Sequence, residues 1–171
     1  MKFLILVLTL SFSLPTFAQS SNEAVELKPF VNDYCSKWPE GGKEDPSQWA
    51  DCCFTHDMHY WIGGTEDEKK SSDKGLKECV KLSGASLSSF IMYIGVRIGG
   101  KPGDTDYAWG FGYNSTRGYE KVPVEELQKA KTILEESEYS QREDTKVLVE
   151  KFINEVLTVK ISNALEQEQK N

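Results

Sequence analysis

The sequence predicts a mainly α-helical protein whose central feature is two antiparallel helices linked by disulfide bonds. Three observations support this prediction. Four cysteines lie between Cys35 and Cys79, two capped helical segments meet at Gly63-Gly64, and no glycine or proline follows Pro123. Because glycine and proline interrupt helices, the chain after Pro123 is expected to be helical.

Composition excludes one large class of function. The chain has 171 residues, with 20 Lys and Arg against 27 Asp and Glu, which gives a net charge of −7. Nucleic-acid-binding domains usually carry a basic patch and a high isoelectric point. We therefore expect no nucleic-acid partner.

The N-terminal residues have the pattern of a secretory signal. Lys2 precedes an apolar run, Phe3 to Leu10, and the sequence Thr16-Phe17-Ala18 provides small residues at the two positions that signal peptidase reads. Residues 1–18 are thus expected to be a signal peptide, cleaved near Ala18, that makes the protein secreted or periplasmic. A retained membrane anchor is the alternative, although a span needs about 20 apolar residues. The later apolar stretch, Phe90 to Ile98, is short and contains Arg97.

Export would place the cysteines in an oxidising compartment, where thiols pair. The four cysteines Cys35, Cys52, Cys53 and Cys79 should form two disulfides. A bond between the adjacent Cys52 and Cys53 would close a strained ring, which leaves two connectivities. A zinc cluster is the alternative, and the absence of a CxxC pair disfavours it.

The first expected helix spans Pro46 to Ile62. Asp45 is a suitable N-cap, Pro46 suits the first helical position, and Gln48 stands where a capping box needs it. Gly63-Gly64 ends the segment.

The second expected helix begins after Thr65 and runs to about Leu82. Thr65 and Glu68 form another capping-box pattern. The connection between the two helices is so short that they should be antiparallel neighbours. The charge run from Glu66 to Lys70 is interpreted as a solvated face.

Two further elements follow. Between Lys101 and Tyr119, aromatic residues alternate with small ones, a period of two that predicts a short β-hairpin; the aromatic positions are Tyr107, Trp109, Phe111 and Tyr113. Beyond it, Val124 to Glu138 and Thr145 to Leu165 are expected to form a C-terminal pair of amphipathic helices.

The first helix carries the residues with chemical potential. On a helical wheel, Cys52, His56 and Tyr60 share one stripe, while Cys53 and Asp57 share a neighbouring stripe. If Cys52 pairs with Cys79, Asp73 of the second helix lies level with the gap between His56 and Tyr60. A carboxylate there could bond the imidazole and the phenol together.

Each stripe suggests a role. A histidine oriented by a carboxylate can act as a general base that takes a proton from an attacking water. Asp57, beside a cysteine that can tie down the loop of Cys35, could share calcium with backbone carbonyls of that loop, because calcium prefers oxygen ligands. The first stripe therefore predicts a general base, and the second predicts a binding site for a cation.

The run Cys52-Cys53-x-x-His56-Asp57-x-x-Tyr60, followed by Asp73 six residues before Cys79, closely resembles the signature of the secreted phospholipase A2 superfamily. The resemblance covers residues 33–80 and points to a divergent, bacterial-type branch. It implies the disulfides Cys35–Cys53 and Cys52–Cys79, His56 as the catalytic base, Asp57 as a calcium ligand, and Asp73 and Tyr60 as supports of the base. It also implies a phospholipase A2-like domain over 19–120, followed by a C-terminal helical extension over 121–171.

The calcium loop departs from the family pattern. The resemblance implies that the backbone carbonyls of Tyr34, Ser36 and Trp38 are calcium ligands, and Asp33 is an alternative that would supply a carboxylate.

Two cysteines of a further family disulfide are replaced together, by His59 and Ser72. This paired loss supports the alignment.

The implied activity is calcium-dependent hydrolysis of the sn-2 ester of glycerophospholipids, with phospholipid at a membrane or micelle interface as the partner. A non-enzymatic lipid- or receptor-binding protein on the same scaffold is the alternative.

His59 is expected to pack or to make surface hydrogen bonds. A zinc site formed by His56, His59 and Asp73 is the remaining alternative for the histidines.

Overall fold

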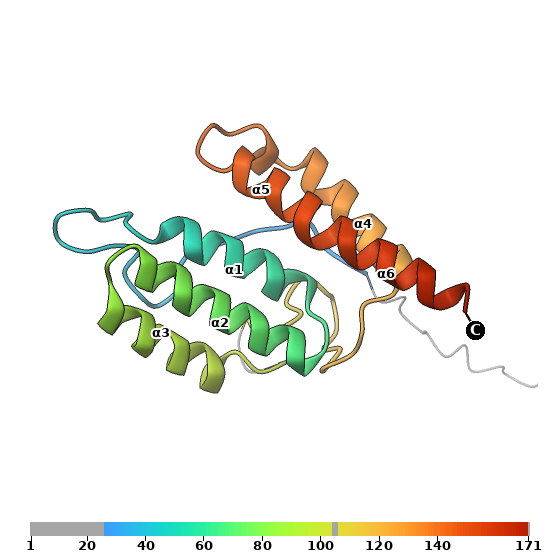
Figure 1. Ribbon diagram of the computed structural model, residues 1–171, viewed down its shortest axis with the longest axis horizontal. Coiled ribbons are helices and arrows are strands. Elements are labelled where there is room, and N and C mark those ends of the chain that lie inside the picture. Colours follow the sequence, from blue (N-terminus) through green and yellow to red (C-terminus); the bar gives the residue numbers. More distant parts are fainter. Residues whose placement is uncertain (1–25, 104–105, 171) are drawn as a thin grey trace, which may run out of the picture.

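The computed structural model describes residues 26–103 and 106–170, and the fold of this part is helical (Figure 1). The predicted signal peptide lies outside the described residues. None of the described helices has the length and hydropathy needed to cross a bilayer. The elements are α1 (Ala50–Ile62), α2 (Glu66–Leu82), α3 (Ser86–Gly99), α4 (Val124–Glu136), the 3₁₀ turn η1 (Glu138–Ser140), α5 (Lys146–Phe152), the π-helical turn η2 (Ile153–Leu157) and α6 (Thr158–Glu168).

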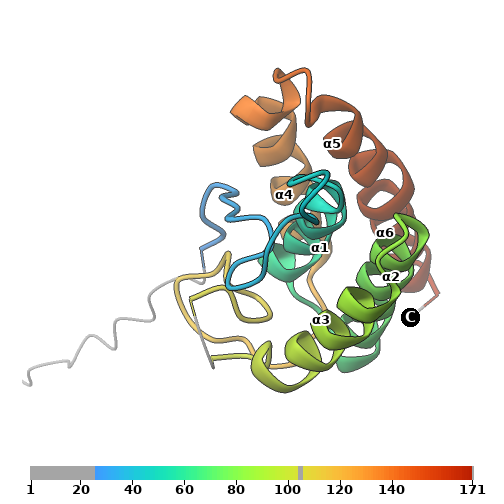
Figure 2. The same cartoon turned by 90° about the vertical axis from the view of Figure 1, so that its left-hand side faces the viewer.

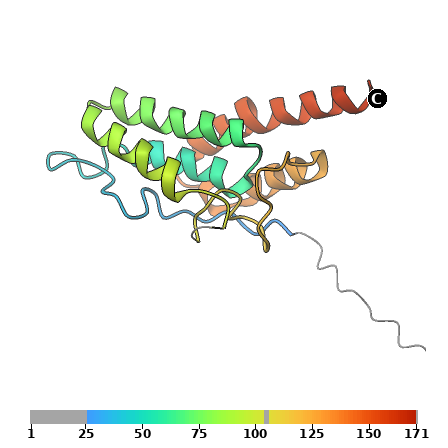
Figure 3. The same cartoon turned by 90° about the horizontal axis from the view of Figure 1, so that it is seen from below.

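The helices form two groups that meet at α1. α2 packs against α1 on one side and against α3 on the other, and α4, η2 and α6 contact one another. α5 joins the groups by packing on α1, as the end-on view in Figure 2 illustrates. Seen from below, α2 and α3 lie side by side along their length (Figure 3).

The start of α1 differs from the sequence prediction. Residues 46–49 form a turn and the helix begins at Ala50, with Trp49 as an N-cap that makes no side-chain cap. Asp45 accepts hydrogen bonds from the backbone and hydroxyl of Ser47, a local turn that competes with helix formation. The Gln48 amide donates to the distant carbonyl of Ser83 at 2.5 Å, so it does not form the predicted capping box.

The start of α2 confirms its prediction. The Thr65 hydroxyl accepts from the Glu68 backbone N–H, and the Glu68 carboxylate accepts from the Thr65 backbone N–H at 2.7 Å. Gly63 precedes this box with φ 68°, a left-handed conformation that favours glycine. The capping box and this glycine turn let α2 reverse direction against α1.

The expected β-hairpin is absent from the described part of residues 101–119, which forms turns. Tyr113 makes one isolated antiparallel bridge with Leu27. The backbone N–H groups of Gly110 and Gly112 donate to carbonyls in the last turn of α1, and a Cβ on Gly112 would lie 2.4 Å from the Trp61 ring. The small residues thus allow close approach to a helix end, and this produces the period of two.

The C-terminal helices form the predicted pair, with one irregularity. α4 is the first member, and α5, η2 and α6 follow one another directly as the second. Within η2 the helix widens into a π turn, and the Thr158 hydroxyl donates to the Ile153 carbonyl five residues back, at 2.9 Å. Lys160 of α6 makes an ion pair with Glu68 of α2 at 2.7 Å, which connects the pair to the start of α2.

The main hydrophobic core contains side chains from both sides of the boundary expected at residue 120. Phe30, Phe54 and Tyr139 pack edge to face, with ring centroids 5.3 to 5.6 Å apart. Helix α1 contributes Trp61, which is fully buried, and the C-terminal helices contribute Leu134, Phe152 and Leu157. A smaller core lies around both disulfides and includes Met92 of α3.

Candidate active site

Two disulfides hold the first turns of α1. Cys53 is bonded to Cys35 of the preceding loop, and Cys52 is bonded to Cys79 near the end of α2. These are the pairings that the family resemblance implies, and they confirm the expectation of two disulfides. His56 and Asp57 stand one helical turn beyond them.

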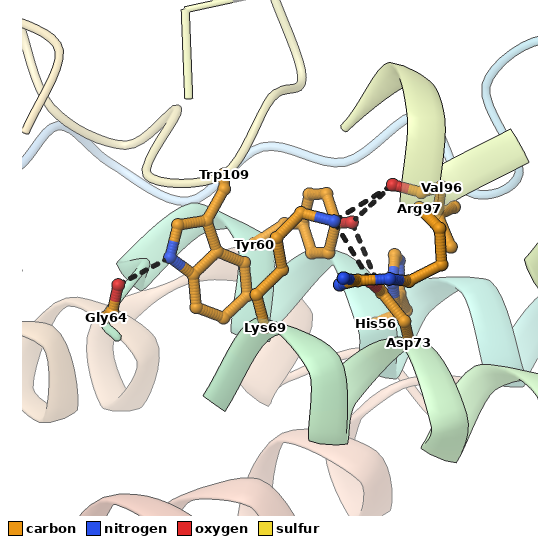
Figure 4. A network of polar contacts seen from close by, with 8 residues as sticks. All are labelled: His56, Tyr60, Gly64, Lys69, Asp73, Val96, Arg97 and Trp109. Atoms are coloured by element: carbon orange, nitrogen blue, oxygen red, sulfur yellow. Dashed lines mark hydrogen bonds and ion pairs between the residues drawn. The ribbon is translucent and has the colours of Figure 1, made fainter. Parts of the chain in front are cut away.

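Asp73 joins the imidazole and the phenol of α1 (Figure 4). Its Oδ1 lies 3.1 Å from His56 Nε2 and accepts a hydrogen bond from the Tyr60 hydroxyl at 2.7 Å. Asp73 has no exposed surface, and His56 is 7% exposed. The structure thus contains both bonds that the helical register makes possible.

Two cations that the sequence analysis did not assign to the site also contact Asp73. Lys69 Nζ and an Arg97 guanidinium nitrogen each donate to Oδ2, at 2.9 and 3.0 Å. Lys69 is 1% exposed, so the interpretation of Glu66 to Lys70 as a solvated face is wrong at this position. The i,i+4 spacing of Lys69 and Asp73 was the available signal. Arg97 comes from α3, which the sequence analysis did not predict as a helix.

Opposite effects fix the charge states of the pair. Burial alone would raise the pKa of Asp73, but hydrogen bonds from His56, Tyr60 and Lys69 hold it well below its ordinary range. Burial lowers the pKa of His56, and the hydrogen bond to Asp73 opposes this effect only in part. At neutral pH the pair is therefore a carboxylate and a neutral imidazole.

These charge states define the tautomer of His56. Because an ionised Asp73 can only accept, Nε2 carries the imidazole hydrogen, and Nδ1 keeps a free electron pair. No hydrogen bond to Nδ1 occurs among the described residues. Burial and Asp73 raise the pKa of Tyr60 well above its ordinary value, so the phenol remains a donor.

Aromatic rings restrict the movement of the network. The His56 and Tyr60 rings have centroids 4.2 Å apart, and Trp109 meets Tyr60 edge to face at 5.1 Å. The Trp109 indole donates to the Gly64 carbonyl at 2.7 Å (Figure 4). The segment expected to be a hairpin therefore serves as a support for Tyr60.

Asp57 lies in a different environment. It is buried, and its Oδ2 has no hydrogen-bond partner. Burial, reinforced by the nearby Asp33 carboxylate and opposed by a backbone hydrogen bond from Asp33, raises the pKa of Asp57 to about 8. A buried carboxylate oxygen without a partner is costly, and a cation would relieve that cost.

The loop next to Asp57 offers further oxygens. Its backbone hydrogen bonds are accepted by the carbonyls of Asp33 and Cys35. The carbonyls of Tyr34, Ser36 and Trp38, which the resemblance implies as ligands, accept none of the backbone hydrogen bonds found in the described residues. Tyr34 and Ser36 both have positive φ, 57° and 53°, a conformation that residues other than glycine seldom adopt. Asp33 lies close enough to Asp57 to raise its pKa, and carboxylate and carbonyl oxygens are the ligand type that calcium prefers.

The two histidines have different partners in the structure. Within 26–103 and 106–170, no group of three or more His, Cys, Asp or Glu side chains could hold a metal ion. His59 packs edge to face on Phe152, with centroids 4.8 Å apart. Burial, together with Lys160 and His56, lowers the pKa of His59 to about 3.

A cavity of about 650 Å³ lies between the α1–α2 pair and the C-terminal helices. His56 and His59 are part of its wall, and Leu148, Phe152 and Val156 give it an apolar side. Asp57 is not among the lining residues. The cavity therefore reaches the candidate base, whereas the candidate cation ligand faces the loop of Cys35.

Comparison with known proteins found no matching protein family, no similar curated protein and no similar solved structure.

Proposed function

We propose that the protein hydrolyses the sn-2 ester of glycerophospholipids in a calcium-dependent reaction, with His56 as general base. The observation that carries this proposal is the pair of His56 and Asp73, in which a buried carboxylate orients a neutral imidazole. A solvated surface histidine needs no such arrangement.

In this reaction, His56 Nδ1 accepts a proton from a water molecule whose oxygen attacks the sn-2 carbonyl carbon. The bond between that carbon and the glycerol oxygen breaks, and the proton held on Nδ1 passes to the departing oxygen. The products are a fatty acid and a lysophospholipid. Asp73 keeps Nε2 protonated throughout, and Tyr60 and Lys69 keep Asp73 ionised.

Asp57, with the carbonyls of Tyr34, Ser36 and Trp38, would hold calcium. The unpartnered Oδ2 of Asp57 and the adjacent Asp33 support this assignment. When bound, calcium supplies positive charge for the phosphate and for the oxyanion that develops on the ester.

A glycerophospholipid labelled in its sn-2 chain tests the proposal in mixed micelles, with calcium or with a chelator. We expect calcium-dependent release of the label and a decrease of about 10²–10⁴-fold for His56→Gln. His59→Gln is the matched control, because it removes an imidazole one turn away that has no carboxylate partner. Full activity of the His56 variant would refute the mechanism.

One observation favours the second candidate, a lipid-binding protein without hydrolytic activity. The cavity that reaches His56 does not include Asp57 among its lining residues. Binding of phospholipid without release of the labelled chain, at any calcium concentration, would favour this function. Release of the labelled chain would exclude it.

A further inference from the structure

Helix α3 has an exposed apolar face. Five of its residues follow helical spacing and share one side, and their exposed fractions range from 40% to 74%: Leu87, Phe90, Ile91, Ile94 and Ile98. The opposite side packs on α2 and buries Ser89 and Met92. The five residues, here termed the α3 stripe, extend over roughly 16 Å at the helical rise per residue. Soluble proteins seldom leave such a continuous apolar face uncovered.

Basic residues border the α3 stripe. Lys70, Lys74, Lys77 and Lys81 lie on one side of α2 at helical spacing. Lys77 Nζ lies 5.2 Å from the centre of the Tyr93 ring on α3, which places this side of α2 next to α3. Helix α3 itself contains no Asp or Glu. Among the neighbouring acids, Glu78 is paired with Lys81 at 3.7 Å.

The lysine row lies on a protein whose overall charge is negative. The chain carries a net charge of −7, which would repel an anionic surface from most directions. The lysine row and the acid-free α3 provide a face where basic side chains can approach anionic groups. An apolar helix face with basic residues at its border is the pattern of a helix that lies in a lipid–water interface.

Helix α3 is also attached to the candidate active site. The Val96 carbonyl accepts hydrogen bonds from Lys69 Nζ at 2.9 Å and from the Tyr60 hydroxyl at 3.3 Å (Figure 4). Arg97 bonds to Asp73 from the next position. The α3 stripe is therefore on a helix whose backbone and side chains hold the His56–Asp73 network.

We propose that the α3 stripe docks on an anionic lipid surface, with its five side chains in the acyl region and the α2 lysines near lipid phosphates. A second copy of the chain is a poorer occupant, because a two-fold contact through this face would bring the lysine rows of both copies together. Docking stands by itself as a binding event. Its consequence for hydrolysis, retention of the protein on the surface that supplies its substrate, rests on the proposed function.

Vesicle sedimentation in the presence of a chelator tests docking without hydrolysis. The protein is used as the cell produces it, with its N-terminus verified by mass spectrometry, and the vesicles contain phosphatidylglycerol with phosphatidylcholine or phosphatidylcholine alone. We expect Phe90→Gln/Ile94→Gln to weaken binding to the anionic vesicles about tenfold or more. Lys70→Gln/Lys74→Gln should weaken it about fivefold per lysine, and only on anionic vesicles.

Val147→Gln/Val159→Gln is the matched control, because these apolar residues, taken together, are at least as exposed as Phe90 and Ile94 but lie on the C-terminal helices. It should bind as the unmodified protein does. Equal binding by the stripe variant and the control would overturn the proposal. So would a dimer, seen by analytical ultracentrifugation without lipid, that the stripe variant abolishes.

The docking proposal and the proposed hydrolytic function can be refuted independently. His56→Gln should bind vesicles normally, and the stripe variant should keep its activity on monomeric short-chain phospholipid while losing activity on vesicles. Vesicle binding without any hydrolysis would refute the proposed function and leave docking intact. Hydrolysis of vesicles that is insensitive to Phe90→Gln/Ile94→Gln would refute docking.

Discussion

Asp73 and Asp57 are buried carboxylates on neighbouring helices, yet their surroundings oppose each other. Both oxygens of Asp73 accept hydrogen bonds, and two cations contact it. Asp57 has an oxygen without a partner and a second carboxylate nearby. The difference shows that partners, and not burial, decide whether a buried carboxylate is a fixed charge. Asp73 is a permanent part of the fold, while Asp57 is suited to a ligand that arrives later.

The largest effect should come from Asp73→Asn, which removes the shared charge from the buried Lys69 and from Arg97. Loss of one member of a buried ion pair typically destabilises a protein by about 3–5 kcal/mol. Urea unfolding monitored by circular dichroism measures it. In the lipid assay, the rate should decrease less than with His56→Gln, because the base is still present. A stability loss below about 1 kcal/mol would mean that Asp73 is not an essential charge.

Asp57→Asn is expected to increase the stability of the calcium-free protein, whereas Asp73→Asn decreases it. With a folded pKa of about 8 and an ordinary value of 3.8, Asp57 keeps a proton that the unfolded chain releases. Stability of the calcium-free protein should therefore decrease as the pH rises from 4 to 8. The variant should be more stable by about 1–3 kcal/mol at pH 8 and no more stable at pH 4.

Calcium sharpens this second test. It should raise the melting temperature of the unmodified protein and leave that of Asp57→Asn unchanged, because the substitution replaces the charged oxygen ligand of helix α1 by a neutral amide. Calorimetry with calcium, and with zinc as a control, measures binding directly. Tight binding of zinc without binding of calcium would contradict the assignment.

A smaller effect is expected for Lys69→Met, which replaces a buried cation by an apolar chain of similar length. Asp73 retains His56, Tyr60 and Arg97, so the loss of stability should be about 1–2 kcal/mol. Comparing this variant with Asp73→Asn in the same urea titration shows which member of the network is essential. Equal losses would mean that Lys69 is as essential to the network as Asp73.

The smallest effect at neutral pH should come from His59→Gln. We expect a change in stability within about 1 kcal/mol and nearly unchanged hydrolysis. Because the folded pKa of His59 is about 3, against an ordinary value of 6.5, its neutral form contributes stability above pH 6.5. That contribution is lost as the pH falls toward 3, so the variant should show a flatter acid profile. A steeper profile would contradict the assigned burial.

Local signals predicted the fold where local contacts decide it. The capping box of Thr65 and Glu68 needs only neighbouring residues, and it forms as expected. The same pattern at Asp45 fails because Gln48 finds an acceptor at Ser83, thirty-five positions along the chain. Helix α3 was not predicted; it begins without a side-chain cap and so lacks the local signal that marks the start of α2.

The candidate site also contains some contacts that sequence spacing predicts and others that depend on how distant elements pack. Given the Cys52–Cys79 pairing that the resemblance implies, the register of the two helices predicts that Asp73 lies level with His56 and Tyr60 along the helix axes. The contribution of Arg97 depends on how α3 packs on α2, which no spacing in the sequence encodes. Lys69 had the right spacing, but its burial follows from the carbonyl of Val96 on the same unpredicted helix.

The π turn at η2 adds one residue to a helix, and this gives the C-terminal segment a rotational phase. Deleting one residue from Ile153–Leu157 would restore an ordinary helix and turn α6 by about 100°. Lys160 would leave Glu68, and Ala164 would leave its buried position. The extra residue thus sets which side of α6 packs on α4 and which side presents Lys160 to Glu68. We expect single-residue insertions or deletions between Ile153 and Glu168 to destabilise the protein, and those beyond Glu168 to be tolerated.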